Sequence, residues 1–216
     1  MRPRHWPTGA VLAALALGLT ACGSSSDGSS GEPAAVITAS QEAGTVVDTP
    51  FPKPDLILTD TAGKKYDLVK ETKGKPMLLY FGYTHCPDVC PTTMSDIAIA
   101  KSKLSASDRA KLQVVFITTD PARDSPKRLG EWLNAQDKSF IGLTGDFTTI
   151  QAGARSVGID VEKPVKEKDG SITSTHGAQV LAYSPKDDMA HVLYMSGTTS
   201  DQFLKDLPTI IKGKNP

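Results

Sequence analysis

Hydrophobic residues gather into short runs that predict the strands of a central sheet. The run 77–81 has apolar side chains on both faces, which is typical of a strand covered by helices on each side. The run 112–118 has the same character, so a second buried strand is expected there. Shorter extended segments are expected at 56–58, 66–69, 140–143, 178–183 and 191–195.

Between these strands, apolar residues recur at three- and four-residue steps, the spacing of one helix face. Pro91 and the pair Ser125-Pro126 are suited to begin helices, and Asp146 is suited to cap another. We therefore expect helices from Pro91, after Ser125, over 147–157 and over 200–211. The polar, Gly-containing segment 162–174 is expected to be a surface loop.

The order of these elements predicts an α/β domain with a thioredoxin-like fold. A hairpin over 51–69 comes first, three strand–helix units follow, and a second hairpin and a closing helix complete the order. We expect a central mixed sheet flanked by helices, with the N-terminal hairpin added to it. Neither an internal repeat nor a second domain is expected.

The first part of the chain has the features of an export signal. Arg2 and Arg4 precede an apolar run over 11–19, which is the length of a signal-peptide core and too short to span a membrane comfortably. The sequence Leu-Thr-Ala-Cys-Gly that follows resembles a bacterial lipobox with Cys22 as the lipidated residue. An ordinary signal peptide with a stray Cys22 is the alternative.

These features predict three parts with different roles. We expect a lipoprotein signal peptide at 1–21, a flexible Ser/Gly-rich tether at 22–48 and the thioredoxin-like domain at 49–216. The domain would then be extracytoplasmic and lipid-anchored to the cell membrane. Nucleic acid is not an expected partner, because 24 basic and 24 acidic residues balance and leave no net basic field.

Cys86 and Cys90 lie four residues apart, directly after the strand 77–81. In a helical turn their Cα atoms would be roughly 6 Å apart, so the spacing allows a soft-metal clamp, a reversible disulfide or a structural disulfide. A structural disulfide that closes so short a loop would stabilise the fold little. The expected position at the start of a helix favours thiolate over thiol.

His176 is the best candidate for a third ligand. His5 lies in the signal peptide, and His85 adjoins Cys86 so closely that we expect it to point away from a site shared by both sulfurs. His191 lies in mid-strand, where a structural or surface role is expected. His176 lies where a loop meets a strand, the commoner place for functional groups.

Two thiolates and one imidazole would form an open three-coordinate site. Thiolate ligands favour Cu(I), and the added nitrogen also accommodates Cu(II). Structural zinc would normally require a fourth protein ligand, and the sequence offers no obvious one.

The cysteine motif and two later segments resemble the Sco/SenC family of copper-binding thioredoxin-like proteins. The resemblance is carried by Phe-Gly-Tyr-Thr-His-Cys-Pro-Asp-Val-Cys-Pro-Thr-Thr at 81–93, by Thr-Asp-Pro-Ala-Arg-Asp at 119–124 and by the later His176. It covers roughly residues 50–212. The cysteine motif with its flanks is highly specific, the second segment is supportive and the histidine match is the loosest.

This resemblance implies a copper site and gives it particular residues. Cys86, Cys90 and His176 match the family's three copper ligands, and Asp120 matches an acidic residue near that site, where a supporting role is expected. Family members commonly have Asp before the histidine, whereas this chain has Thr175, which removes a neighbouring carboxylate.

The implied function is a membrane-attached copper chaperone without turnover of its own. Its partner would be cytochrome c oxidase subunit II, whose binuclear copper centre it would help to metallate, and another extracytoplasmic copper chaperone is a further candidate partner. The alternative is an enzyme, a thiol-disulfide reductase that keeps the subunit's copper-ligand cysteines reduced through Cys86 and Cys90. Disulfide formation removes both thiolate ligands, so copper loading and oxidation exclude one another.

Overall fold

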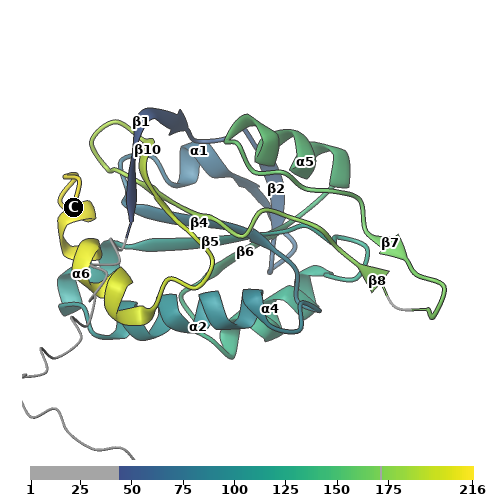
Figure 1. The fold of residues 1–216 in the computed structure, drawn as a ribbon. Helices are drawn as coiled ribbons and strands as arrows, with labels where there is room; N and C mark the ends of the chain where they lie inside the picture. Colours follow the sequence, from purple (N-terminus) through teal and green to yellow (C-terminus); the bar gives the residue numbers. More distant parts are fainter. Residues whose placement is uncertain (1–43, 171) are drawn as a thin grey trace, which may run out of the picture. The chain divides into compact units, whose positions relative to one another are not determined.

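The structure is a computed structural model that describes residues 44–170 and 172–216. Eight strands in this part form one mixed sheet in the order β1-β10-β9-β4-β5-β6-β2-β3 (Figure 1). A mixed sheet with covering helices confirms the predicted thioredoxin-like α/β fold. The strands at its centre are parallel β4 (Met77–Gly82), β5 (Gln113–Thr118) and β6 (Ile141–Thr144), with β9 (Val180–Tyr183) antiparallel to β4.

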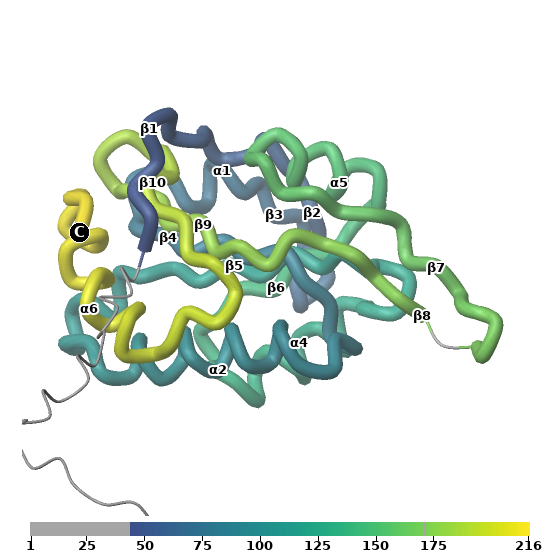
Figure 2. Tube along the Cα trace, in the orientation of Figure 1, coloured from purple at the N-terminus to yellow at the C-terminus, as the bar shows by residue number. Residues whose placement is uncertain are grey.

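Strand β4 is buried along its whole length and divides the core into two clusters. Leu78 and Tyr80 face one cluster, whereas Met77, Leu79 and Phe81 face the other, as the alternation of strand side chains requires. Residues of α2 (Val89–Ser102), α4 (Pro126–Asn134) and α6 (Ser200–Ile210) complete the first cluster. Residues of α1 (Leu68–Glu71) and α5 (Phe147–Ser156) complete the second, on the opposite face (Figures 1 and 2).

Helices α4, α5 and α6 begin where the sequence predicted, whereas the start of α2 was misplaced. Ser125 accepts a hydrogen bond from the Arg128 amide before α4, and Asp146 does the same for the Thr149 amide before α5. Helix α2 begins at Val89 rather than at Pro91, so Pro91 is its third residue. Proline is tolerated there because the first amides of a helix have no intrahelical acceptor.

The predicted N-terminal hairpin is present, with a shorter return than expected. Its strands are β2 (Ile57–Asp60) and β3 (Lys65–Asp67), and β2 attaches it to the edge of the sheet beside β6. The residues after Asp67 were predicted to extend the strand, but they form helix α1. The reason is local, because the Asp67 side chain accepts a hydrogen bond from the Lys70 amide and caps this helix.

The folded domain begins earlier than predicted. Strand β1 (Thr45–Pro52) pairs with β10 (Met189–Tyr194), so the last residues of the expected tether, 45–48, belong to the sheet. The predicted loop 162–174 contains a small hairpin of β7 (Val165–Lys166) and β8 (Ile172–Thr173), which Figure 2 shows extending past the main sheet. Helix α3 (Ala106–Lys111) was not predicted, and it buries none of its residues.

The predicted signal peptide and the lipidation residue Cys22 lie outside the described residues. Within the described ranges, no helix is both long and apolar enough to cross a membrane.

Candidate metal centre

The two cysteines lie at the junction of β4 and α2, as predicted. Cys86 is in the turn after the strand, where its amide donates to the Tyr83 carbonyl at 3.2 Å. Cys90 is the second residue of α2, and its amide donates to Cys86 Sγ at 3.4 Å. Both are free thiols. The first turn of the helix therefore directs an N–H group at the Cys86 sulfur.

The Cys90 sulfur is fully buried, and the backbone of Gly82 makes room for it. A Cβ atom at Gly82 would lie 2.9 Å from Cys90 Sγ and 2.8 Å from the Tyr80 ring, closer than real Cβ atoms pack. The Tyr80 hydroxyl donates to Cys90 Sγ at 3.6 Å. Burial raises the pKa of Cys90 to about 12, and hydrogen bonds from the Tyr83 backbone and the Tyr80 hydroxyl only partly oppose it. The expectation that the helix start makes this cysteine a thiolate is therefore wrong for Cys90.

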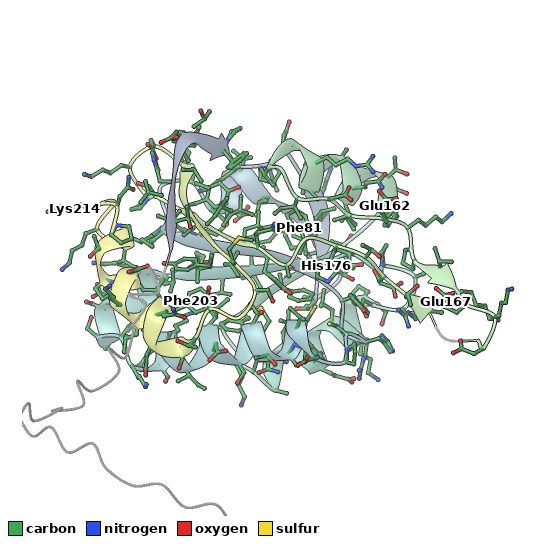
Figure 3. All side chains as sticks on the ribbon, viewed as in Figure 1. Phe81, Glu162, Glu167, His176, Phe203 and Lys214 are labelled. Carbon is green, nitrogen blue, oxygen red and sulfur yellow. The ribbon has the colours of Figure 1, made fainter. Side chains whose placement is uncertain are left out.

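His176 comes to the same place from a segment 86 residues further along the chain. Its Nε2 atom lies 3.6 Å from Cys90 Sγ, and its Nδ1 atom lies 3.0 Å from the Gly177 carbonyl oxygen. Because a carbonyl only accepts, the hydrogen bond to Gly177 assigns the proton to Nδ1 and leaves the Nε2 lone pair toward the sulfur. Figure 3 labels His176 on the segment between β8 and β9, over the start of α2.

Two aromatic rings and burial keep this imidazole fixed and neutral. The rings of Tyr83 and Tyr80 meet it edge-on, with centroids 5.6 Å and 6.1 Å away. Burial lowers the pKa of His176, and the hydrogen bond with Gly177 opposes this effect without reversing it. A neutral imidazole held by its second nitrogen is the form in which histidine binds metals.

The donor atoms suit a soft metal, although they do not yet form a closed site. Among the described residues, no group of three His, Cys, Asp or Glu side chains is already gathered as a metal site. Cys90 and His176 are close together, and the Cys86 sulfur accepts a hydrogen bond from the Cys90 amide and interacts with the Cys90 side chain. A three-coordinate site therefore requires these side chains to move closer together.

Asp120 is connected to the candidate ligands through two other side chains. Its buried carboxylate pairs with Arg123 Nε, and the Arg123 guanidinium lies 5.9 Å from the centre of the Tyr83 ring. Tyr83 in turn contacts His176. In the described part of the chain, no hydrogen bond joins Asp120 to either cysteine or to His176, so its supporting role stays a prediction.

Asp124 contacts the cysteine loop directly, although no role was predicted for this residue. Its fully buried carboxylate accepts hydrogen bonds from the Thr84 amide at 2.9 Å, the Thr84 hydroxyl at 2.6 Å and the Thr118 hydroxyl at 2.7 Å. It thereby fixes the loop before Cys86 to the end of β5. The available signal was the acidic residue that ends the Thr-Asp-Pro-Ala-Arg-Asp segment. Gly82 and Tyr83 had no signal beyond the cysteine motif that contains them, and Tyr80 had none beyond its place in the apolar strand.

The other two histidines in the described residues make different contacts. The His85 ring lies beside Asp124, with 3.5 Å between Nδ1 and a carboxylate oxygen, and its side chain is 40% exposed. His191 in β10 pairs with Asp187 at 2.8 Å, which agrees with the structural or surface role expected of it.

Comparison with known proteins assigns the chain to a family. A sequence model described as SCO1/SenC matches residues 19–212, which is nearly the whole chain. The chain belongs to the SCO1/SenC family.

Relatives of this SCO1/SenC chain occur in bacteria and mitochondria. A protein of Stutzerimonas stutzeri whose name describes copper binding is 36% identical over 132 residues, which cover 61% of this chain and 64% of that protein. Mitochondrial SCO2 of Saccharomyces cerevisiae is 41% identical over 95 residues, or 44% of this chain and 31% of that protein. The match thus spans less than two thirds of each of these relatives.

Solved structures of the family have the same fold. Bradyrhizobium japonicum ScoI with copper bound is 33% identical, with a TM-score of 0.63 over 75% of this chain and 98% of that one. Apo Sco1 of Thermus thermophilus is 29% identical, with a TM-score of 0.67 over 77% of this chain and 95% of that one.

Proposed function

We propose that this SCO1/SenC protein carries copper on Cys86, Cys90 and His176 and serves the assembly of cytochrome c oxidase. The observation that carries the proposal is the 3.6 Å approach of His176 Nε2 to Cys90 Sγ, with the Nε2 lone pair facing the sulfur. Soft thiolates with one imidazole suit copper, and the copper-bound structures of relatives support the same metal.

Copper is the cargo in this proposal, so binding and release matter equally. At neutral pH Cys90 must lose its proton before its sulfur can bind the metal, because burial raises the pKa of this thiol to about 12. His176 needs no such step, since its pKa is lowered by burial and the ring is neutral. Protonation or oxidation of the sulfurs would favour release to a partner.

The receiving partner in this proposal is cytochrome c oxidase subunit II, with its binuclear copper centre. The family and the cysteine motif support a role in oxidase assembly. Lipidation at Cys22, and with it attachment to the outer side of the cell membrane, is part of the proposal and rests on the sequence at the N-terminus. A tethered domain would reach a membrane-embedded subunit without leaving the membrane.

Titration of the full-length, reduced chain with Cu(I) against a competing chelator tests the carrier function. We expect one copper per chain, with tight binding lost in Cys86→Ser and in Cys90→Ser. Cys22→Ser is the matched control, because it removes the third cysteine and should leave binding unchanged. If both single variants at the motif still bound copper stoichiometrically, the ligand assignment would be wrong.

A thiol-disulfide reductase is the second candidate function. The observation that favours it is the pair of free thiols at the start of α2, of which the Cys86 sulfur is the more exposed and so the more accessible to a disulfide partner. His176→Ala separates the two functions in cells that depend on this protein. Loss of oxidase assembly with intact thiol chemistry supports copper transfer, whereas normal assembly supports the reductase.

A further inference from the structure

We propose that His85 and Cys86 form an outer receiving site, where copper binds first before it passes to Cys90 and His176. This inference rests on the proposed copper-carrier function and adds a further metal-binding residue to it. Its basis is the position and the fixed hydrogen bonding of His85, which the final three-ligand site does not use.

His85 and the two cysteines lie at different depths. The Cys90 sulfur is fully buried, and Tyr83 beside it is 8% exposed. His85, by contrast, is 40% exposed in its side chain, and Cys86 is partly exposed. A metal ion that arrives from solvent or from a partner protein therefore meets His85 and Cys86 before it meets Cys90.

The hydrogen bonds of Thr84 fix which nitrogen of His85 is available. The Thr84 hydroxyl gives its only proton to Asp124 at 2.6 Å, so it can only accept from the other groups near it. One of these is the Arg128 Nε–H at 3.3 Å, and the other is His85 Nδ1 at 3.2 Å. His85 therefore carries its proton on Nδ1, which leaves the lone pair on Nε2.

This environment resembles that of histidines that bind metals. Such residues usually turn their second nitrogen toward a carboxylate, a carbonyl or water, which fixes the ring and raises its basicity. The buried Asp124 carboxylate lies 3.5 Å from His85 Nδ1, and Nε2 has no hydrogen-bond partner within the described residues. Asp124 thus orients His85 while it also holds the loop that carries Cys86.

Transfer from the outer to the inner site is a ligand exchange without a change in copper oxidation state. The bond between copper and His85 Nε2 breaks, and bonds to Cys90 Sγ and His176 Nε2 form. The Cys90 proton leaves to the solvent, while Cys86 holds the metal throughout. Transfer also requires a movement of side chains that brings the three inner ligands together, because they are not yet gathered in the described structure.

The rate of copper loading tests this inference. Reduced full-length protein is mixed with a Cu(I)–bathocuproine complex in a stopped-flow instrument, and the loss of the chelate colour is followed. His85→Ala should lower the second-order rate at least about tenfold while the stoichiometry and the equilibrium affinity stay near wild type. His191→Ala is the control, because it removes another carboxylate-paired histidine, away from the cysteines, and should load at the wild-type rate.

Two results would overturn the proposal. A wild-type loading rate in His85→Ala would show that no outer site exists. A loss of copper affinity as large as that of His176→Ala would show that His85 is a ligand of the final site. In either case wild-type protein still binds copper through the cysteines. A wild type that bound none would instead refute the proposed function itself.

A spectroscopic measurement tests the site without a rate. In the double variant Cys90→Ser, His176→Ala, only the outer ligands remain, and X-ray absorption of the Cu(I)-loaded protein should detect a nitrogen ligand that disappears when His85→Ala is added. An identical copper spectrum in the double and triple variants would contradict the proposal.

Discussion

At the scale of single residues, Gly82 decides how deeply the Cys90 sulfur is buried. Gly82→Ala would place a methyl group 2.9 Å from this sulfur and 2.8 Å from the Tyr80 ring, so one or both must move. We expect about 1–3 kcal/mol lower stability from the overpacking and a copper affinity at least about tenfold weaker. Urea denaturation and chelator competition measure the two effects.

Gly130→Ala is the control for this change. The atoms nearest to the added methyl group belong to the Thr61 side chain, the first of them at 3.2 Å, so copper binding should stay at the wild-type level. Equal copper affinities in Gly82→Ala and Gly130→Ala would show that the position of Cys90 does not depend on Gly82.

The pKa values of single residues predict how copper affinity depends on pH. Because burial raises the pKa of Cys90 to about 12, this thiol is protonated throughout the neutral range. The proton therefore competes with copper for the Cys90 sulfur. The affinity should therefore rise at least about tenfold for each pH unit between pH 6 and pH 8. His176 adds less to the slope than an exposed histidine would, because burial lowers its pKa. Chelator competition at several pH values measures the slope, and a flat profile would contradict the buried-thiol assignment.

At the scale of elements, Asp124 joins the cysteine loop to the end of β5. Asp124→Ala would leave the Thr84 amide and the Thr84 and Thr118 hydroxyls without their buried acceptor. We expect a loss of about 2–4 kcal/mol in the free energy of unfolding. Asp201→Ala removes a carboxylate that is 83% exposed and should change stability by less than about 0.5 kcal/mol. Similar urea midpoints for both variants would contradict the anchoring role of Asp124.

Helices and strands that are determined by residues within or next to them were predictable from the sequence. Strand β4 has an unbroken apolar run, and α4 and α5 begin at caps that lie beside them in the chain. Strand β1 was missed because its partner β10 lies about 140 residues away, and no nearby residue signals that pairing. The start of α2 was misplaced because Pro91 fits several positions of a first helical turn.

The same division applies to the candidate site. The spacing of Cys86 and Cys90 and the position of His176 at a loop boundary were visible in the sequence. The burial of Cys90 was not, since it depends on Gly82 and Tyr80 packing around the sulfur. The hydrogen bonds of Asp124 were not predicted either, because they join the loop after β5 to a loop 40 residues earlier.

At the scale of the whole molecule, copper loading and cysteine oxidation should exclude one another. The described structure has both cysteines as free thiols. Reduced cysteines can supply thiolate ligands to a metal, whereas a disulfide cannot. Full-length protein oxidised to the Cys86–Cys90 disulfide should therefore bind no copper tightly, and reduction should restore one copper per chain. Equilibrium dialysis before and after reduction measures this, and tight stoichiometric binding by the oxidised form would argue against thiolate ligands.

The central claim is that copper binds to two sulfurs from one strand–helix junction and to one nitrogen from His176. X-ray absorption of the Cu(I)-loaded, full-length protein measures this ligand set most directly. We predict two sulfur ligands and one nitrogen ligand in the wild type, with the nitrogen lost in His176→Ala. A copper shell made of sulfur alone in the wild type, or an unchanged nitrogen ligand in His176→Ala, would contradict the claim.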